Sequence, residues 1–207
     1  MPTGATNADA MSLEEQPDLL SEATERDLLR WLLADLHDDL DGKLSRFKHL
    51  MDLSGILGSG GTMMPGGETT FAAWSEARTS FIHGNYVATV LLCQGLAEHI
   101  LAAHLELGLG GERLPDRVAF SATLERCVER QIISETDASD LKKLMNLRNP
   151  LSHYRNIDDP SNLSRRVLDS MEPAMNHLIR DASFAIGLAV KLLALPAFRL
   201  GPPIRPK

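Results

Sequence analysis

Apolar residues recur every three or four positions along most of this chain, a spacing that predicts amphipathic or buried α-helices. The first such stretch runs roughly from Glu22 to Met51 and is expected to form a single helix. Its apolar face comprises Leu29, Leu32, Leu36, Leu40, Leu44 and Phe47. Acidic residues and Lys43 occupy the opposite face, so the predicted helix is amphipathic.

The same spacing continues after residue 70, where apolar stripes are separated by glycine and proline. They predict helices from Phe71 to Ile82, from Tyr86 to Leu107, from about Asp116 to Ile132, and after a cap at Thr136 or Asp137. A further helix is expected at Asp159-Pro160, which have the N-cap and N1 signature. Pro173 should break or kink it, and a last helix runs to Leu195. No strand-like alternation persists, so no strand is predicted.

Glycine and proline concentrate in residues 54–70, which are therefore expected to form a loop or linker. This segment would separate an N-terminal helix (residues 21–53) from a helical body (residues 71–196). The two ends, residues 1–20 and 197–207, are expected to be disordered, since the first is small, polar and acidic and the second is rich in proline.

Composition supports helices throughout. Leucine and alanine are abundant, whereas aromatic residues make up only 5% of the chain, and sheets usually contain more β-branched and aromatic residues. The predicted fold class is therefore all-α.

The net charge of −7 is concentrated at the N-terminus, because residues 1–50 hold 11 acidic and 5 basic side chains. The remainder is nearly neutral. This balance argues against a broadly basic nucleic-acid-binding protein, so any RNA contact has to come from a local basic patch.

Cysteine and hydropathy indicate a cytoplasmic protein without a membrane segment. Cys93 and Cys127 are isolated and show neither metal-binding spacing nor a disulfide framework. The N-terminus has no basic and apolar regions of a signal peptide. The longest apolar stretch, from Phe184 to Leu195, is interrupted by Lys191 and is too short to span a bilayer.

The most informative stretch is Arg148-Asn149-Pro150-Leu151-Ser152-His153. Five residues along a straight helix would place Arg148 and His153 well over 90° apart. Pro150 changes this geometry, because the residue before a proline is pushed away from helical angles. Asn149 is then either the N-cap of a new helix with Pro150 at N1, or the site of a kink, and both arrangements bring the two side chains nearer.

These residue types suit the cleavage of RNA. Attack of a ribose 2′-OH on the adjacent phosphate needs a base, an acid for the leaving oxygen, and a cation for the charged phosphorane. His153 can act as base or acid near neutral pH, and Arg148 offers a fixed fork for phosphate oxygens. Asn149 can orient the substrate by hydrogen bonding. One histidine is too few for both proton transfers, which a two-fold dimer would remedy.

The stretch resembles the Arg-polar-x-x-x-His signature of HEPN domains. Residues Gly84-Asn85-Tyr86 to Ala97-Glu98-His99-Ile100-Leu101 are similar to the long early helix of that family, and Arg180-Asp181-Ala182 opens a helix similar to its last one. The resemblance covers about Phe71 to Leu195. It implies an up-and-down helical bundle, here with an extra N-terminal helix, and a homodimer whose cleft is lined by Arg148, Asn149 and His153.

The resemblance also implies a metal-independent endoribonuclease without a cofactor, of a kind found in toxin–antitoxin or phage-defence systems. Some toxin members carry a modified tyrosine two residues after the histidine. Here that position is Arg155 and the tyrosine is Tyr154, which argues against modification by a nucleotidyltransferase antitoxin. Other members only bind nucleotides or proteins. A catalytically silent binding module therefore remains the alternative, and a structural helical adaptor is a third interpretation.

Further residues are assigned supporting roles. Glu98 is expected to be a buried or partner-paired carboxylate that supports Arg148, with His99 and His104 on the surface. RNA would be contacted by Lys142, Lys143, Arg155, Arg165 and Arg166, although Asp158 and Asp159 among them are equally consistent with a solvated face. No pair of ligands has the spacing of a helical zinc site, so no metal is expected.

Overall fold

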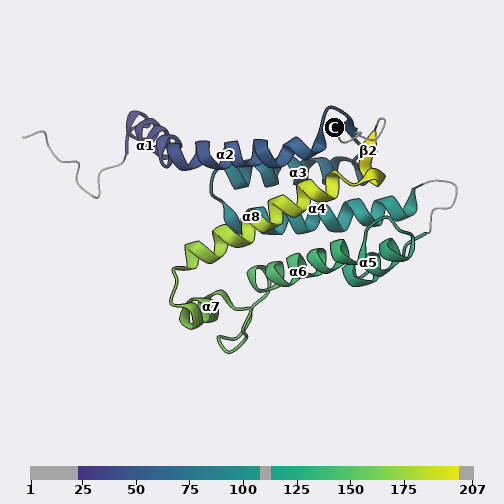
Figure 1. The fold of residues 1–207 in the computed structure, drawn as a ribbon. Coiled ribbons are helices and arrows are strands. Elements are labelled where there is room, and N and C mark those ends of the chain that lie inside the picture. Colours follow the sequence, from purple (N-terminus) through teal and green to yellow (C-terminus); the bar gives the residue numbers. More distant parts are fainter. Residues whose placement is uncertain (1–22, 108–112, 201–207) are drawn as a thin grey trace, which may run out of the picture. The chain divides into compact units, whose positions relative to one another are not determined.

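The computed structural model describes residues 23–107 and 113–200 and confirms an all-α helical bundle (Figure 1). Its helices are α1 (Glu25–His37), α2 (Leu40–Ser54), α3 (Gly67–Ile82), α4 (Tyr86–Glu106), α5 (Phe120–Glu129), α6 (Glu135–Ser152), α7 (Leu163–Ser170) and α8 (Ala174–Leu193). Two 3₁₀ turns, η1 (Gly55–Leu57) and η2 (Pro196–Phe198), accompany two short strands, β1 (Gly61–Thr62) and β2 (Arg199–Leu200). The expectations for residues 1–20 and 201–207 lie outside the described residues.

The expected single helix over Glu22–Met51 is two helices, α1 and α2. The backbone N–H of Asp38 closes α1 on the carbonyls of Ala34 and Asp35, and Asp39 follows with a φ of 52°. Aspartate tolerates this left-handed conformation better than most residues and competes with helical hydrogen bonds. The chain divides into two units after Leu40, so α2 belongs with the later helices and not with α1.

The apolar face expected on this N-terminal stretch is not buried. No residue of α1 is buried, and Trp31 is 61% exposed. The six residues predicted to form the stripe are all exposed. In α2, Leu50 is buried in the core, and the partly buried Leu53 packs against it. Periodicity therefore predicted helical structure here, but the single continuous apolar face is wrong, because its residues are divided between α1 and α2 and are all exposed.

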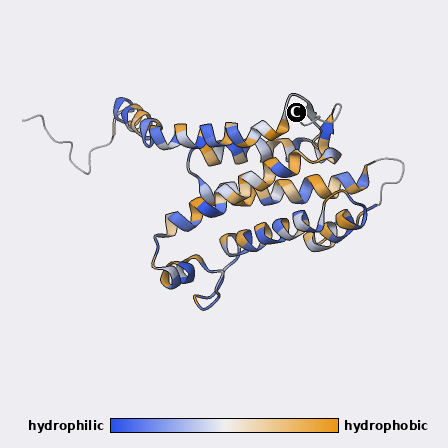
Figure 2. Ribbon diagram, viewed as in Figure 1, coloured by the Kyte–Doolittle hydropathy of each residue, from blue (hydrophilic) through white to orange (hydrophobic). Residues whose placement is uncertain are grey.

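Helix α4 is the centre of the bundle and packs against α3, α5, α6 and α8. Ten of its residues are buried, and apolar residues cover much of α4 and α8 in Figure 2. Among the described helices, α4 is the one long and apolar enough to cross a membrane by length and composition. Its burial in the bundle gives a sufficient reason for that composition.

The glycine-rich segment is folded onto the body and is not a free linker. Leu57 and Met64 pack against the core, and β1 pairs antiparallel with β2, with Gly61 opposite Leu200. Arg199 donates hydrogen bonds to the carbonyls of Leu57 and Gly60. Gly60 is required here, because a Cβ at this position would lie 2.8 Å from the backbone oxygen of Leu200.

The prediction that the chain is disordered from residue 197 is therefore wrong for residues 197–200. Phe198 is fully buried, and its ring packs edge-on against His104 with 5.1 Å between ring centroids. His104 is half-buried and not a surface residue as expected, and burial lowers its pKa. The strand pairing needs a partner about 140 residues away, which no local pattern reveals.

Several helix ends differ from their predicted positions. Helix α5 begins at Phe120 and not near Asp116, and α7 begins at Leu163 with Asn162 as its N-cap. The expected start at Asp159-Pro160 is a turn in which Asp159 accepts hydrogen bonds from Ser161. The break at Pro173 is confirmed, since this proline directly precedes α8.

Helix α6 is capped by Ser134 and not by Thr136 or Asp137. The Ser134 hydroxyl accepts from the Asp137 N–H, and the Asp137 carboxylate accepts from the Ser134 N–H, which is a complete capping box. Burial raises the pKa of Asp137, but hydrogen bonds from Lys191 and Ser134 outweigh it, so the pKa is lowered overall.

Replacing Ser134 with alanine should lower the free energy of unfolding by about 1 kcal/mol, because the first turn of α6 loses its cap. Urea unfolding followed by circular dichroism measures this change. Thr136→Ala, on an exposed residue of the same turn, is the matched control and should change stability far less. Equal losses in the two variants would show that the cap contributes nothing specific.

Candidate functional site

The Arg148–His153 motif lies at the C-terminal end of α6. Pro150 is inside the last turn, the helix ends at Ser152, and His153 is its C-cap with φ −129° and ψ 138°. The N–H of His153 donates to the carbonyl of Asn149, and the Ser152 hydroxyl donates to the carbonyls of Arg148 and Asn149. Asn149 is thus a helical residue, and the expected N-cap with Pro150 at N1 is wrong.

The helix end brings the side chains of Arg148 and His153 together. Arg148 Nη1 lies 3.3 Å from His153 Nε2. The wide separation calculated for a straight helix does not apply, since the extended backbone at His153 redirects its side chain. A guanidinium only donates hydrogen bonds, so Nε2 is the acceptor and a neutral His153 carries its proton on Nδ1.

The motif is accessible and incompletely paired. His153 is exposed, whereas Arg148 and Asn149 are half-buried. The Nε–H of Arg148 is buried and has no acceptor among the described residues. Buried donors without acceptors are rare in folded proteins and deserve a functional explanation. Neither residue is both buried and fully paired, which was the arrangement expected of a purely structural adaptor.

Neither residue assigned to support the motif, Tyr154 or Glu98, forms a hydrogen bond with it in the described part of the chain. Tyr154 is 91% exposed. Glu98 accepts a hydrogen bond of 2.9 Å from Gln94 on the same helix, and no hydrogen bond or ion pair joins it to Arg148 within the described chain. The structure therefore provides Arg148 with no carboxylate from α4.

The three arginines expected to contact RNA each have a carboxylate partner. Arg155 lies 3.8 Å from Asp159, and Arg165 lies 3.0 Å from Asp169. Arg166 forms two short hydrogen bonds with Asp181, a residue of α8. The local positive charge near the motif is accordingly smaller than the sequence alone indicates.

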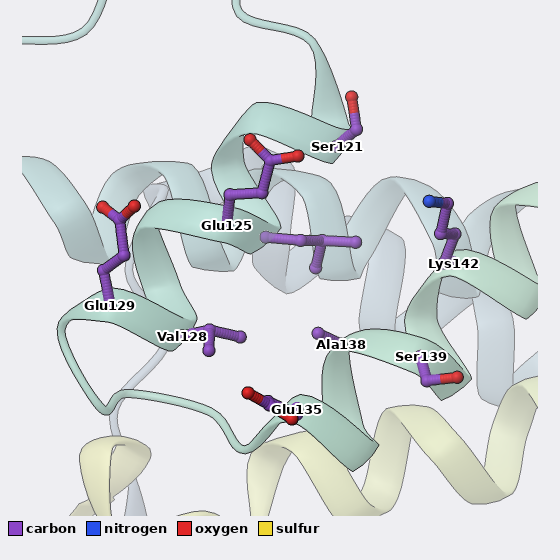
Figure 3. Close-up of a pocket in the computed structure, with 9 residues that line it drawn as sticks. Ser121, Glu125, Val128, Glu129, Glu135, Ala138, Ser139 and Lys142 are labelled. Atoms are coloured by element: carbon purple, nitrogen blue, oxygen red, sulfur yellow. The ribbon is translucent and has the colours of Figure 1, made fainter.

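Lys142 and Lys143, the two lysines expected to contact RNA, lie in different environments. Lys143 places its ammonium group 4.6 Å from the centroid of the Phe184 ring. Lys142 lines an open groove of about 460 Å³ between α5 and α6. Figure 3 shows Glu125, Glu129 and Glu135 around this groove, whose apolar lining includes Val128. Its acidic rim is unfavourable for RNA, and none of the motif residues lines it.

Sequence reasoning missed a set of polar contacts on the chain segment that follows the motif. Asn162 caps α7 and also donates a 2.8 Å hydrogen bond to the carbonyl of Arg155. Ser170 at the end of α7 contacts His177 on α8. An Asn followed by an amphipathic turn is a recognisable cap signal, but its second bond to Arg155 is visible only in the fold.

The arrangement places an anion-binding group, Arg148, beside a group that can transfer a proton, His153. In the described residues, no three His, Cys, Asp or Glu side chains are grouped as metal ligands would be. Comparisons with protein-family models, with curated proteins and with solved structures give no match.

Proposed function

We propose that this protein is a metal-independent endoribonuclease of the HEPN type. The observation that carries the proposal is the contact between Arg148 Nη1 and an exposed His153 Nε2, 3.3 Å apart at a helix end. A fixed cation and a titratable imidazole side by side are the groups that phosphoester cleavage requires. The resemblance of the motif and its flanking helices to HEPN domains supports the same assignment.

In the proposed reaction Arg148 turns its hydrogen bond from His153 Nε2 to a phosphate oxygen. The freed Nε2 then removes the proton of a ribose 2′-OH, and O2′ attacks the adjacent phosphorus. The bond from phosphorus to the 5′ oxygen breaks, and that oxygen takes a proton from an acid. The products are a 2′,3′-cyclic phosphate and a 5′-OH. Arg148 stabilises the negative charge on the phosphorane, and Asn149 orients the substrate.

The acid is assigned to His153 of a second copy, since each chain supplies a single histidine at the motif. We therefore expect a homodimer with two motifs facing one cleft. A cytoplasmic location and an antitoxin or other protein partner, in a toxin–antitoxin or phage-defence setting, complete the proposal.

A second function is favoured by one specific observation. Arg155, Arg165 and Arg166 are each paired with a carboxylate, which leaves little free positive charge to follow an RNA backbone. A catalytically silent HEPN-type module that binds a single nucleotide or a protein needs far fewer phosphate contacts. It is the alternative that remains if RNA is not cleaved.

The proposal is tested by incubating the purified protein with labelled single-stranded and structured RNAs in EDTA. We expect cleavage with 2′,3′-cyclic phosphate ends, and no cleavage of 2′-O-methyl RNA of the same sequence, because that substrate lacks the nucleophile. Cleavage of the methylated RNA would exclude the proposed mechanism. Failure to cleave any RNA, combined with nucleotide binding, would favour the silent module.

A further inference from the structure

The segment after the motif has several hydrogen bonds and an ion pair that join it to α8. None of the eight residues of α7 is buried, although α7 packs against the start of α8. A helix held without buried apolar side chains depends on its hydrogen bonds and ion pairs for its position. These contacts run back along the chain toward His153.

The first contact in this series is made by Asn162. Its Oδ1 accepts from the N–H groups of Ser164 and Arg165, which caps α7. Its Nδ2 donates a 2.8 Å hydrogen bond to the carbonyl of Arg155, two residues after His153. One side chain therefore fixes the backbone beside His153 to the first turn of α7.

The second contact joins α7 to α8. The guanidinium of Arg166 donates from Nη1 to Asp181 Oδ2 at 2.6 Å and from Nη2 to Oδ1 at 2.9 Å. The side chain of Asp181 is only 7% exposed. Such a bidentate hydrogen bond to a buried carboxylate fixes the orientation of the Arg166 guanidinium as well as its distance from Asp181. The hydrogen bonds to Asp181 raise the pKa of Arg166.

A third contact holds the other end of α7. Arg180 donates to His177 Nδ1 at 3.1 Å, so the proton of a neutral His177 is on Nε2 and is donated to the Ser170 hydroxyl, 2.9 Å away. Ser170 in turn donates to the carbonyl of Arg166. His177 acts here as a hydrogen-bond donor to Ser170, so this pair is not an activated serine nucleophile.

We infer that Asn162 and Arg166 are positioning residues for His153. Asp181 fixes Arg166 and thereby the position of α7. Asn162, the N-cap of α7, in turn fixes the carbonyl of Arg155, two residues after His153. This inference rests on the proposed function and assigns Arg166 a role different from direct contact with RNA. Proton transfer is sensitive to displacement, and a shift of about 1 Å can reduce a rate about 100-fold.

Asn162→Asp separates this role from helix capping. Aspartate is as good an N-cap as asparagine and suits the positive end of a helix, but it cannot donate to the Arg155 carbonyl. Ser164→Asp is the matched control, because it adds the same charge to the same exposed turn and leaves Asn162 intact. We expect Asn162→Asp to lower kcat about 10- to 100-fold, with KM and melting temperature close to those of Ser164→Asp.

Arg166→Lys provides a second variant that keeps a cation beside Asp181 but loses the planar fork. It should lower kcat less than Asn162→Asp and should also leave KM nearly unchanged. A residue that contacted RNA directly would instead raise KM. An increase of KM without loss of kcat in Arg166→Lys would overturn the positioning role of Arg166.

The imidazole ¹⁵N signals of His153, identified by their loss in His153→Ala, report its position without any RNA. We expect Asn162→Asp to shift or broaden them, whereas Ser164→Asp leaves them unchanged. Identical spectra and kcat in the two variants would overturn the inference. If wild-type protein cleaves no RNA, the proposed function fails, and the ¹⁵N signals alone then decide whether Asn162 positions His153.

Discussion

Replacing His153 with alanine should lower the rate of RNA cleavage by about 10²- to 10⁴-fold, the usual contribution of a general acid or base. The side chain is exposed and caps α6 through its backbone N–H, which alanine retains. The loss should therefore fall on catalysis and not on folding. Single-turnover cleavage of a labelled RNA, with circular dichroism of both proteins, measures the two effects separately.

His99→Ala is the control for this variant, because His99 is an exposed histidine of α4 outside the motif. It should cleave RNA at the wild-type rate. Arg148→Ala should lower the rate by about 10²- to 10³-fold, as expected when one donor to a developing oxyanion is lost. Full activity in His153→Ala would remove the proton-transfer role and with it the support for this site.

Replacing Phe198 with alanine should lower the free energy of unfolding by about 3–5 kcal/mol, the usual cost of truncating a fully buried aromatic residue. Phe198 is 0% exposed and packs against His104. The variant should also relieve the burial of His104, so the pKa of this histidine should rise toward its ordinary value. Chemical denaturation and the pH titration of the His104 NMR signals measure the two effects.

Leu200→Ala is the comparison, since Leu200 belongs to the same C-terminal segment but is 55% exposed. Its loss should cost far less stability. If Phe198→Ala and Leu200→Ala were equally mild, residues 197–200 would not be part of the cooperative fold in solution.

Periodicity predicted the helices well where they are buried. Tyr86 to Leu107 was expected as a long helix and is found as Tyr86–Glu106 at the centre of the bundle. The same reasoning missed the break at Asp39, because aspartate is compatible with a helix surface as well as with a left-handed turn. It also missed β1 and β2, since strands of two residues show no alternation.

The motif was recognisable as an arginine and a histidine five residues apart, but its geometry was not. The contact between Arg148 and His153 depends on where α6 ends, and Pro150 within the last turn gave an ambiguous signal. The sequence identified the basic residues around the motif but not the groups that their side chains contact. Whether Arg166 meets RNA or Asp181 depends on how α7 packs on α8, and this is a property of the tertiary structure.

The pairing of β1 with β2 has a consequence for how the protein is made. Arg199 contacts Thr62 across 137 residues of sequence, so this pairing cannot form until residue 199 has been synthesised and has left the ribosome. At a translation rate of roughly 5–20 residues per second, synthesis of the 137 residues from Thr62 to Arg199 takes roughly 7–27 s. Phe198 comes after all the helices of the bundle, so the apolar surface that it covers beside His104 is open to chaperones until this residue emerges.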